Sequence, residues 1–174
     1  MGIRSRPEHA SLSNGGRDKA GFWKNFWNMR LPVEGLISAG VVVRDHKGAV
    51  IAAMSVKRAS EMDVDFIVAF AVLATIQFVL DMGLHHIILE GDSLVIVRAL
   101  QSSWAFMASF GHFVEQAKSL LARFRSWGVK HVKREGNSVA YCLARMAIAM
   151  EGFSVCIEGV PLSLRSLVKR EASF

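Results

Sequence analysis

The order of strand and helix patterns constrains the fold of this chain more than any single motif does. Strand patterns come first, with a possible strand at 29–36, an apolar β-branched run at 39–44 and a returning run at 49–55. The residues 45–48, Asp-His-Lys-Gly, join the last two runs as a tight turn. Helical patterns then alternate with two short strands. This order predicts an α/β fold, in which an antiparallel three-strand meander and parallel strands form one mixed sheet flanked by helices.

The later elements have recognisable ends. A helix is predicted at 64–82, where Gly83 can act as its C-cap. A short strand at 86–90 ends in an acidic residue, and Asp92 or Ser93 can cap the helix that follows it. The remaining predicted elements are a helix at 110–126, a strand at 129–133 and a helix at 138–150 that Asn137 can cap.

The longest apolar run, 66–80, is either a core helix or a membrane segment. It contains Thr75 and Gln77, and it is shorter than the roughly 18–20 residues that cross a bilayer. We therefore predict a buried helix, with a membrane segment as the alternative that the mean hydropathy of +0.31 leaves open. The N-terminus has no apolar stretch typical of a secretory signal. These features predict no membrane association and an intracellular, nuclear or cytoplasmic location.

Charge and length suggest one domain with extensions. The 174 residues carry 21 Lys and Arg against 15 Asp and Glu, and the net charge of +6 is compatible with a polyanionic partner. We predict a flexible basic arm at 1–26, one domain at 27–165 and a C-terminal tail at 166–174. This arm either contacts phosphates electrostatically or is a solvated tail without a ligand. The two cysteines are too few for a disulfide scaffold.

Two short motifs do not support a function. Residues 91–94 spell the GDSL of a serine esterase family, but no Asp follows Asp92 to orient a histidine base. His85 and His86 are adjacent on a predicted strand, so their side chains point to opposite faces and cannot easily share a metal ion.

Five segments in a fixed order carry the functional signal. They are Val33-Glu34-Gly35, the hairpin AGVVVRDHKG, the long apolar helix, Leu89-Glu90-Gly91-Asp92-Ser93 and the stretch HVKREGNSVAYCLA from His131. Together they resemble the plant ribonuclease H-like domains that derive from non-LTR retrotransposons, the reverse-transcriptase-like group. Those domains read K-L-N-V-D-G-A, G-V-V-I-R-D-x-x-G, A-E-A-x-A-L, E-S-D-S and H-V-x-R-E-x-N-x-x-A-D-x-L-A. The resemblance covers residues 27–165.

The resemblance implies a fold and a reaction. The fold is a ribonuclease H-like domain with a mixed five-stranded sheet flanked by helices. In the family, four carboxylates hold two Mg²⁺ ions, which activate a water and stabilise the leaving oxygen when the RNA strand of an RNA–DNA hybrid is cut. Carboxylate oxygens suit Mg²⁺ because it is a hard cation.

Only part of this carboxylate set is present. Asp92 keeps the ligand after the fourth strand, and Glu34 falls on the first-strand ligand. Val68 replaces the helix glutamate and Tyr141 replaces the last aspartate. Asp92 and Glu34 could hold at most one Mg²⁺ weakly, so we expect hydrolysis to be lost or strongly weakened.

The residues predicted to contact nucleic acid are better preserved. Lys133, Arg134 and Asn137 match the substrate side of the family, and Ser93 lies at a helix start that can receive a phosphate. For Arg134, an ion pair with Glu135 is the alternative. The predicted function is binding of an RNA–DNA hybrid or RNA by a domain with a degenerate active site.

Two further hypotheses stay open at this point. One is an active hybrid ribonuclease with a rearranged metal site that uses Glu34, Asp92 and Glu90. The other is a non-catalytic interaction module or a retroelement relic that binds neither metal nor nucleic acid. The oligomeric state is not predicted.

Overall fold

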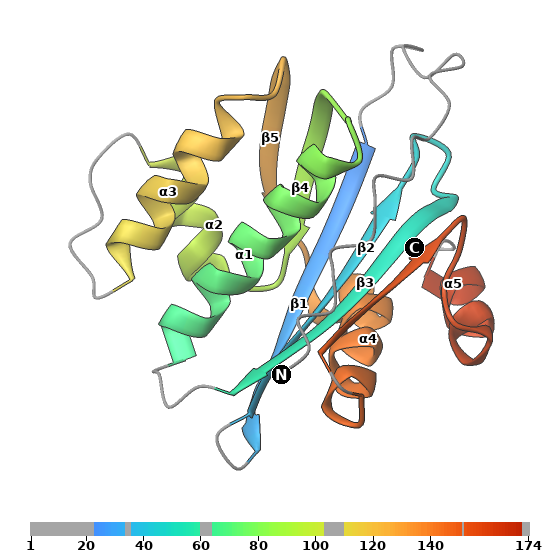
Figure 1. Cartoon of the computed structure of the whole chain (residues 1–174). Coiled ribbons are helices and arrows are strands. Elements are labelled where there is room, and N and C mark those ends of the chain that lie inside the picture. The colour runs from blue at the N-terminus through green and yellow to red at the C-terminus, as the bar shows by residue number, and fades with distance from the viewer. Residues whose placement is uncertain (1–22, 34–35, 60–63, 103–109, 151, 172–174) are drawn as a thin grey trace, which may run out of the picture.

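A single mixed sheet organises the chain. The computed structural model describes residues 23–33, 36–59, 64–102, 110–150 and 152–171. The sheet has the strand order β5-β4-β1-β2-β3-β6 (Figure 1). The pairs β1–β2, β2–β3 and β3–β6 are antiparallel, and the pairs β1–β4 and β4–β5 are parallel. The strands are β1 (Trp23–Val33), β2 (Leu36–Arg44), β3 (Val50–Ala59), β4 (His86–Gly91), β5 (Ser126–His131) and β6 (Phe153–Ile157).

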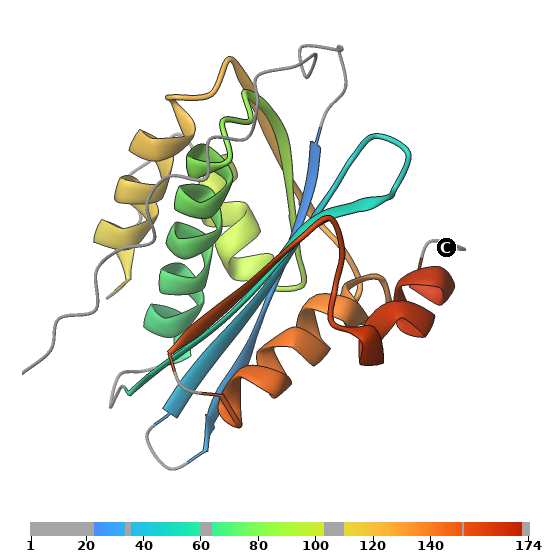
Figure 2. The same cartoon turned by 45° about the vertical axis from the view of Figure 1, so that its right-hand side comes forward.

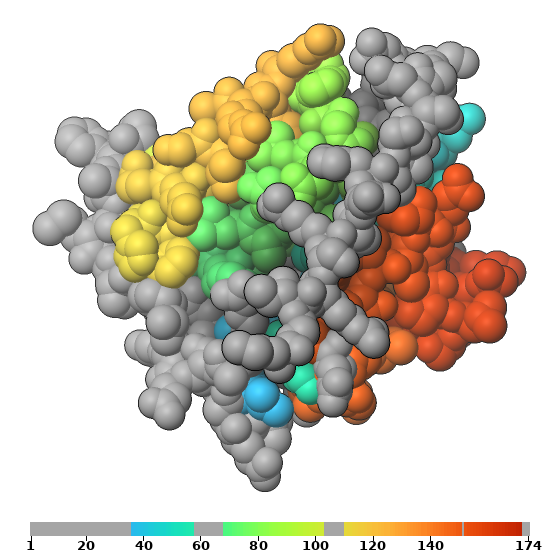
Figure 3. Space-filling model, viewed as in Figure 1, coloured from blue at the N-terminus to red at the C-terminus, as the bar shows by residue number. Residues whose placement is uncertain are grey.

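Helices cover both faces of the sheet, which confirms the predicted fold class. One group of helices lies on one face and a second group on the other, as Figures 1 and 2 show. The first group is α1 (Val64–Asp81), α2 (Leu94–Gln101) and α3 (Gly111–Leu121), and the second is α4 (Ser138–Ile148) and α5 (Arg165–Glu171). Two short 3₁₀ turns, η1 (Arg134–Asn137) and η2 (Leu162–Leu164), precede α4 and α5. The space-filling view shows α3, in yellow, on the opposite side of the molecule from the orange-red C-terminal elements (Figure 3).

The alternation of side chains along β2 divides the core into two layers. Val41 and Val43 point to the layer with α1, whereas Val42, between them, points to the layer with α4. All three side chains are fully buried. This period-two pattern is the expected result for a central strand buried on both faces.

The long apolar run forms a core helix, as predicted. Ala69, Val72, Ile76 and Val79 of α1 are at most 2% exposed. The helix ends where Gly83 takes a φ of 71° and its amide donates to the carbonyl of Leu80 at 2.9 Å, as expected for a glycine C-cap. Within the described ranges, no helix is both long enough and apolar enough to span a membrane.

Four parts of the chain differ from the sequence prediction. α3 ends at Leu121 rather than at 126, and β5 spans Ser126–His131 rather than 129–133. β1 begins at Trp23, so the first strand starts earlier than 29 and includes part of the predicted arm. Its pairing with both β2 and β4 holds this segment in the sheet. The register with β2 shifts between Arg30 and Val33, on either side of Pro32, which has no N–H to donate. β6 is a sixth strand that the prediction lacked, and α5 occupies the predicted tail.

Candidate nucleic-acid interface

Asp92 lies at the carboxyl end of β4. The strand is apolar and buried at Ile87 and Leu89, and its last residue, Gly91, pairs with Trp27 of β1 and His131 of β5. Because β1, β4 and β5 are parallel to one another, the carboxyl ends of β4 and β5 lie at the same edge of the sheet. The chain that leaves β5 therefore passes Asp92 on its way to α4.

Two side chains from η1 contact the Asp92 carboxylate. Arg134 Nε donates to Oδ2 at 3.4 Å and Asn137 Nδ2 donates to Oδ1 at 3.5 Å. The Asp92 side chain is 18% exposed, the Arg134 side chain is 80% exposed, and Asn137 is fully buried. The structure thus brings together three of the residues predicted from the sequence, and Arg134 pairs with Asp92 rather than with Glu135.

α4 is held against the sheet by a very close approach at Gly40. A Cβ atom at this position would lie 2.1 Å from the Ala140 carbonyl oxygen and 2.6 Å from the Ala144 amide nitrogen. Only glycine permits this contact, because any side chain would enter the α4 backbone. Gly40 in turn pairs with Asn28 of β1, so β1 and the residues around Tyr141 are joined through one strand.

The pairing register identifies the β1 residue nearest the end of β4. Trp27 pairs with Gly91, and Asn28 is the next residue along β1 as Asp92 is along β4. From Trp27, β1 continues for another six residues, or roughly 20 Å, to Val33. Glu34, the predicted first-strand ligand, lies outside the described residues. The register therefore favours Asn28, which sequence reasoning missed, as the first-strand position beside Asp92.

The family assignment follows from a model match over most of the folded region. The family described as reverse transcriptase-like matches residues 33–147. The chain belongs to the reverse transcriptase-like family. The search of curated protein sequences gave no match.

Several solved structures with a similar fold are ribonucleases H. Ribonuclease H1 from the archaeon Halobacterium salinarum has a TM-score of 0.68 at 23% identity, covering 74% of this chain and 98% of its own. The N-terminal ribonuclease H domain of a Mycobacterium tuberculosis protein gives 0.64 at 19%, covering 75% and 95%. LC11 ribonuclease H1, isolated from compost and solved in complex with an RNA/DNA hybrid, gives 0.62 at 19%, covering 74% and 96%. At these identities the likeness concerns the fold.

Val68 and Tyr141, which the family resemblance aligns with metal ligands, have side chains that cannot bind a hard cation as a carboxylate does. Val68 of α1 packs against the core on the α1 face, and Tyr141 of α4 is half-buried. In the part of the chain that the structure describes, no group of three or more His, Cys, Asp or Glu side chains could hold a metal ion. This donor set does not fit the two Mg²⁺ ions expected from the family.

The other predicted contact residues surround this edge with different exposures. Lys133 is exposed and directly precedes η1, whereas Ser93 is half-buried before α2 and its side chain makes no capping hydrogen bond. Glu90 is only 6% exposed in β4, where it pairs with Phe26 of β1 and Lys130 of β5 through the backbone. Lys133 and Arg134 are therefore accessible at this edge, next to the exposed acidic Glu135.

Sequence reasoning also missed the residue that caps α4. Glu171 Oε1 accepts hydrogen bonds from the Ser138 hydroxyl at 3.0 Å and the Val139 amide at 3.1 Å. The first turn of α4 is thus capped by a carboxylate from the end of α5, which favours the helix dipole. No local sequence signal could reveal this cap, because 33 residues separate Glu171 from Ser138.

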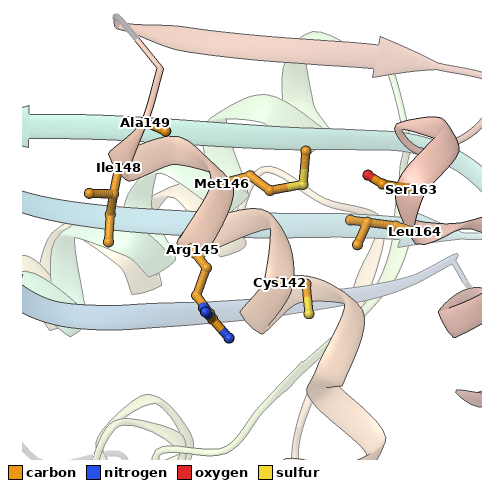
Figure 4. Close-up of a pocket in the computed structure, with 7 residues that line it drawn as sticks. All are labelled: Cys142, Arg145, Met146, Ile148, Ala149, Ser163 and Leu164. Atoms are coloured by element: carbon orange, nitrogen blue, oxygen red, sulfur yellow. The ribbon is translucent and has the colours of Figure 1, made fainter.

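A separate hollow of about 490 Å³ lies between α4 and η2. Figure 4 shows Met146 extending from α4 toward Ser163 and Leu164. It is lined by Cys142, Arg145, Met146, Ile148, Ala149, Ser163 and Leu164. None of these residues is a carboxylate, and none contacts Asp92 in the described structure.

Proposed function

We propose that this domain binds nucleic acid, with an RNA–DNA hybrid or RNA as its ligand, and that its hydrolysis of the RNA strand is lost or strongly weakened. The observation that carries the proposal is the contact of Asp92 with Arg134 and Asn137 in a domain where Val68 and Tyr141 occupy ligand positions. The fold of the family is retained while its charge pattern at the site is changed.

Binding is supported by the exposed cations around Asp92. Lys130, Lys133 and Arg134 are all exposed at the carboxyl end of β5 and in the turn after it, and the whole chain carries a net charge of +6. Such a cluster neutralises backbone phosphates and provides sequence-independent affinity. LC11 ribonuclease H1, which shares the fold, was solved with an RNA/DNA hybrid. An intracellular compartment, nuclear or cytoplasmic, agrees with such a ligand.

Loss of hydrolysis is supported by the donor set. Asp92 is a carboxylate, but Val68 and Tyr141 are not, and the β1 register favours the neutral Asn28 beside Asp92. Metal ions in this chemistry stabilise the charged transition state by several kcal/mol, so their loss lowers the rate by orders of magnitude.

The first experiment is a cleavage assay. The purified protein is incubated with an end-labelled RNA–DNA hybrid in Mg²⁺ or Mn²⁺, beside Asp92→Asn prepared identically. We expect no cleavage above that of the variant. Metal-dependent cleavage by the parent alone would instead establish an active ribonuclease with a rearranged metal site.

The second experiment measures binding to the same hybrid over a range of salt concentrations. We expect affinity to fall steeply with salt, and Arg134→Ala to reduce the slope by about one. Arg123→Ala is the matched control, because it removes the same exposed charge after α3, near the amino end of β5. If a folded protein binds neither the hybrid nor RNA at low salt, the remaining hypothesis is an interaction module or a retroelement relic.

A further inference from the structure

The contacts of the Asp92 carboxylate differ from those of a metal ligand. Each of its oxygens accepts a hydrogen bond from a nitrogen donor of η1, one charged and one neutral. A guanidinium beside a carboxylate supplies the positive charge that a divalent ion would otherwise supply. The described residues around it also fail to complete a cation site, as shown above.

Arg134 is held by one edge of its guanidinium group only. Its Nε donates to Asp92, and within the described residues its two Nη groups make no hydrogen bond. A guanidinium carries five N–H donors in a planar fork, so four remain for a ligand. The side chain is 80% exposed, and a fork of this kind matches the geometry of a phosphate.

The other phosphate-binding feature of this edge is already used. The first turn of α4 donates its Val139 amide to Glu171, which places a negative charge at that helix start. The Val139 amide is therefore already used by Glu171 and is not available to a phosphate. The anion site of this edge is therefore centred on Arg134 rather than on α4.

We propose that Asp92 is a positioning residue that orients Arg134, and that this pair binds a backbone phosphate of nucleic acid without a divalent cation. The inference rests on the proposed nucleic-acid function and specifies how its site works. In this chain, the aspartate that the family uses as a metal ligand holds an arginine, and the arginine takes the place of the metal in attracting the phosphate. Buried Asn137 fixes the second oxygen of the carboxylate.

The test compares affinity for a short labelled RNA–DNA hybrid in EDTA and in Mg²⁺ at matched ionic strength. We expect Mg²⁺ to give no gain in affinity over EDTA, because the Asp92–Arg134 pair needs no divalent cation and Mg²⁺ competes with the protein for the phosphates. Arg134→Ala is expected to weaken binding about tenfold in EDTA, and Arg134→Lys nearly as much, because an ammonium lacks the fork. Arg123→Ala should have a much smaller effect.

A double-mutant cycle tests the positioning role of Asp92. If Asp92 acts through Arg134, then Asp92→Ala weakens binding, and adding Arg134→Ala weakens it by only about twofold more. Circular dichroism and thermal melting show whether each variant is folded. If Asp92→Ala does not fold, the comparison of Arg134→Lys with Arg134→Ala still decides the role of the fork.

Three results would overturn this inference. If the parent binds the hybrid only in Mg²⁺, and Asp92→Asn loses this Mg²⁺ dependence, then Asp92 is a metal ligand and the proposed binding function stays intact. Full affinity in Arg134→Lys, or equal effects of Arg134→Ala with and without Asp92, would remove the oriented fork. A folded protein that binds no hybrid in either buffer would remove the proposed function together with this inference.

Discussion

Glu171 and Arg44 form a buried ion pair between the last helix and the end of β2. Arg44 Nη2 donates to Glu171 Oε2, and both side chains are 5% exposed. The other carboxylate oxygen accepts from Ser138 and Val139 at the start of α4, and Arg44 Nη1 donates to the Gly48 carbonyl at 3.1 Å. One carboxylate therefore joins α5, α4 and the β2–β3 turn, next to the segment that carries Arg134 and Asn137.

Removing this carboxylate should be costly. We expect Glu171→Ala to lower the free energy of unfolding by about 3–5 kcal/mol, because it removes the carboxylate that pairs with the buried Arg44 guanidinium. Urea denaturation followed by circular dichroism measures the change. Glu115→Ala is the matched control, since Glu115 is half-exposed and pairs with Lys118 on the surface of α3, where an ion pair contributes less than about 1 kcal/mol.

Replacing both partners separates the charge effect from packing. The double variant Arg44→Met with Glu171→Met should lose less stability than Glu171→Ala, because no unpaired charge stays buried. Equal or greater loss in the double variant would indicate that hydrogen bonding to Ser138 and Val139, rather than the ion pair, carries the stabilisation.

The close contact between α4 and Gly40 of β2 predicts a strong effect of a small substitution. We expect Gly40→Ala to destabilise the domain by about 3 kcal/mol or more, because its Cβ would overlap the Ala140 carbonyl and α4 would have to move. Gly128→Ala in β5 is the control, since a Cβ there meets nothing within 4 Å. A shift of the melting temperature that is no larger for Gly40→Ala than for Gly128→Ala would contradict the close packing.

The elements that local patterns specify were predictable from the sequence. The turn at Gly48 takes a φ of 83°, and α1 spans Val64–Asp81 against a predicted 64–82. These features depend on nearby residues, such as a glycine at a turn or an apolar run with a C-cap. The mixed sheet and its cover of helices on both faces followed from the order of these elements.

The missed elements depend on partners that are distant in the sequence. β1 mixes aromatic strand formers with Lys, Asn, Arg and Pro32, so its sequence pattern is ambiguous. Its pairing with β2 on one edge and β4 on the other shows that it is a strand. β6 has only five residues and pairs with β3 alone. The cap from Glu171 and the register at Asn28 likewise need the fold, whereas the ligand at Glu34 stays a prediction from the motif comparison.

The exposed edge strand predicts self-association at high concentration. Phe153, Val155 and Ile157 alternate along β6 and are 62%, 39% and 50% exposed, and the strand carries no charged residue. Edge strands of this kind pair with other chains unless a charge prevents it. We expect Val155→Lys to lower light scattering in concentrated samples. Leu162→Lys, which adds the same charge at a 76% exposed position outside the sheet, should lower it less.

Restoring carboxylates tests the cause of the proposed loss of catalysis. The variant with Asn28→Asp, Val68→Glu and Tyr141→Asp places three acids with Asp92, and oxygen-rich sites of this type bind Mg²⁺. We expect Mg²⁺ to raise the melting temperature of this variant, because an ion that binds only the folded state stabilises it. The melting temperature of the parent should not change. The amide variant Val68→Gln with Tyr141→Asn, which keeps Asn28, is the control for shape without charge. An equal Mg²⁺ response in parent and restored variant would show that these three positions do not form the metal site.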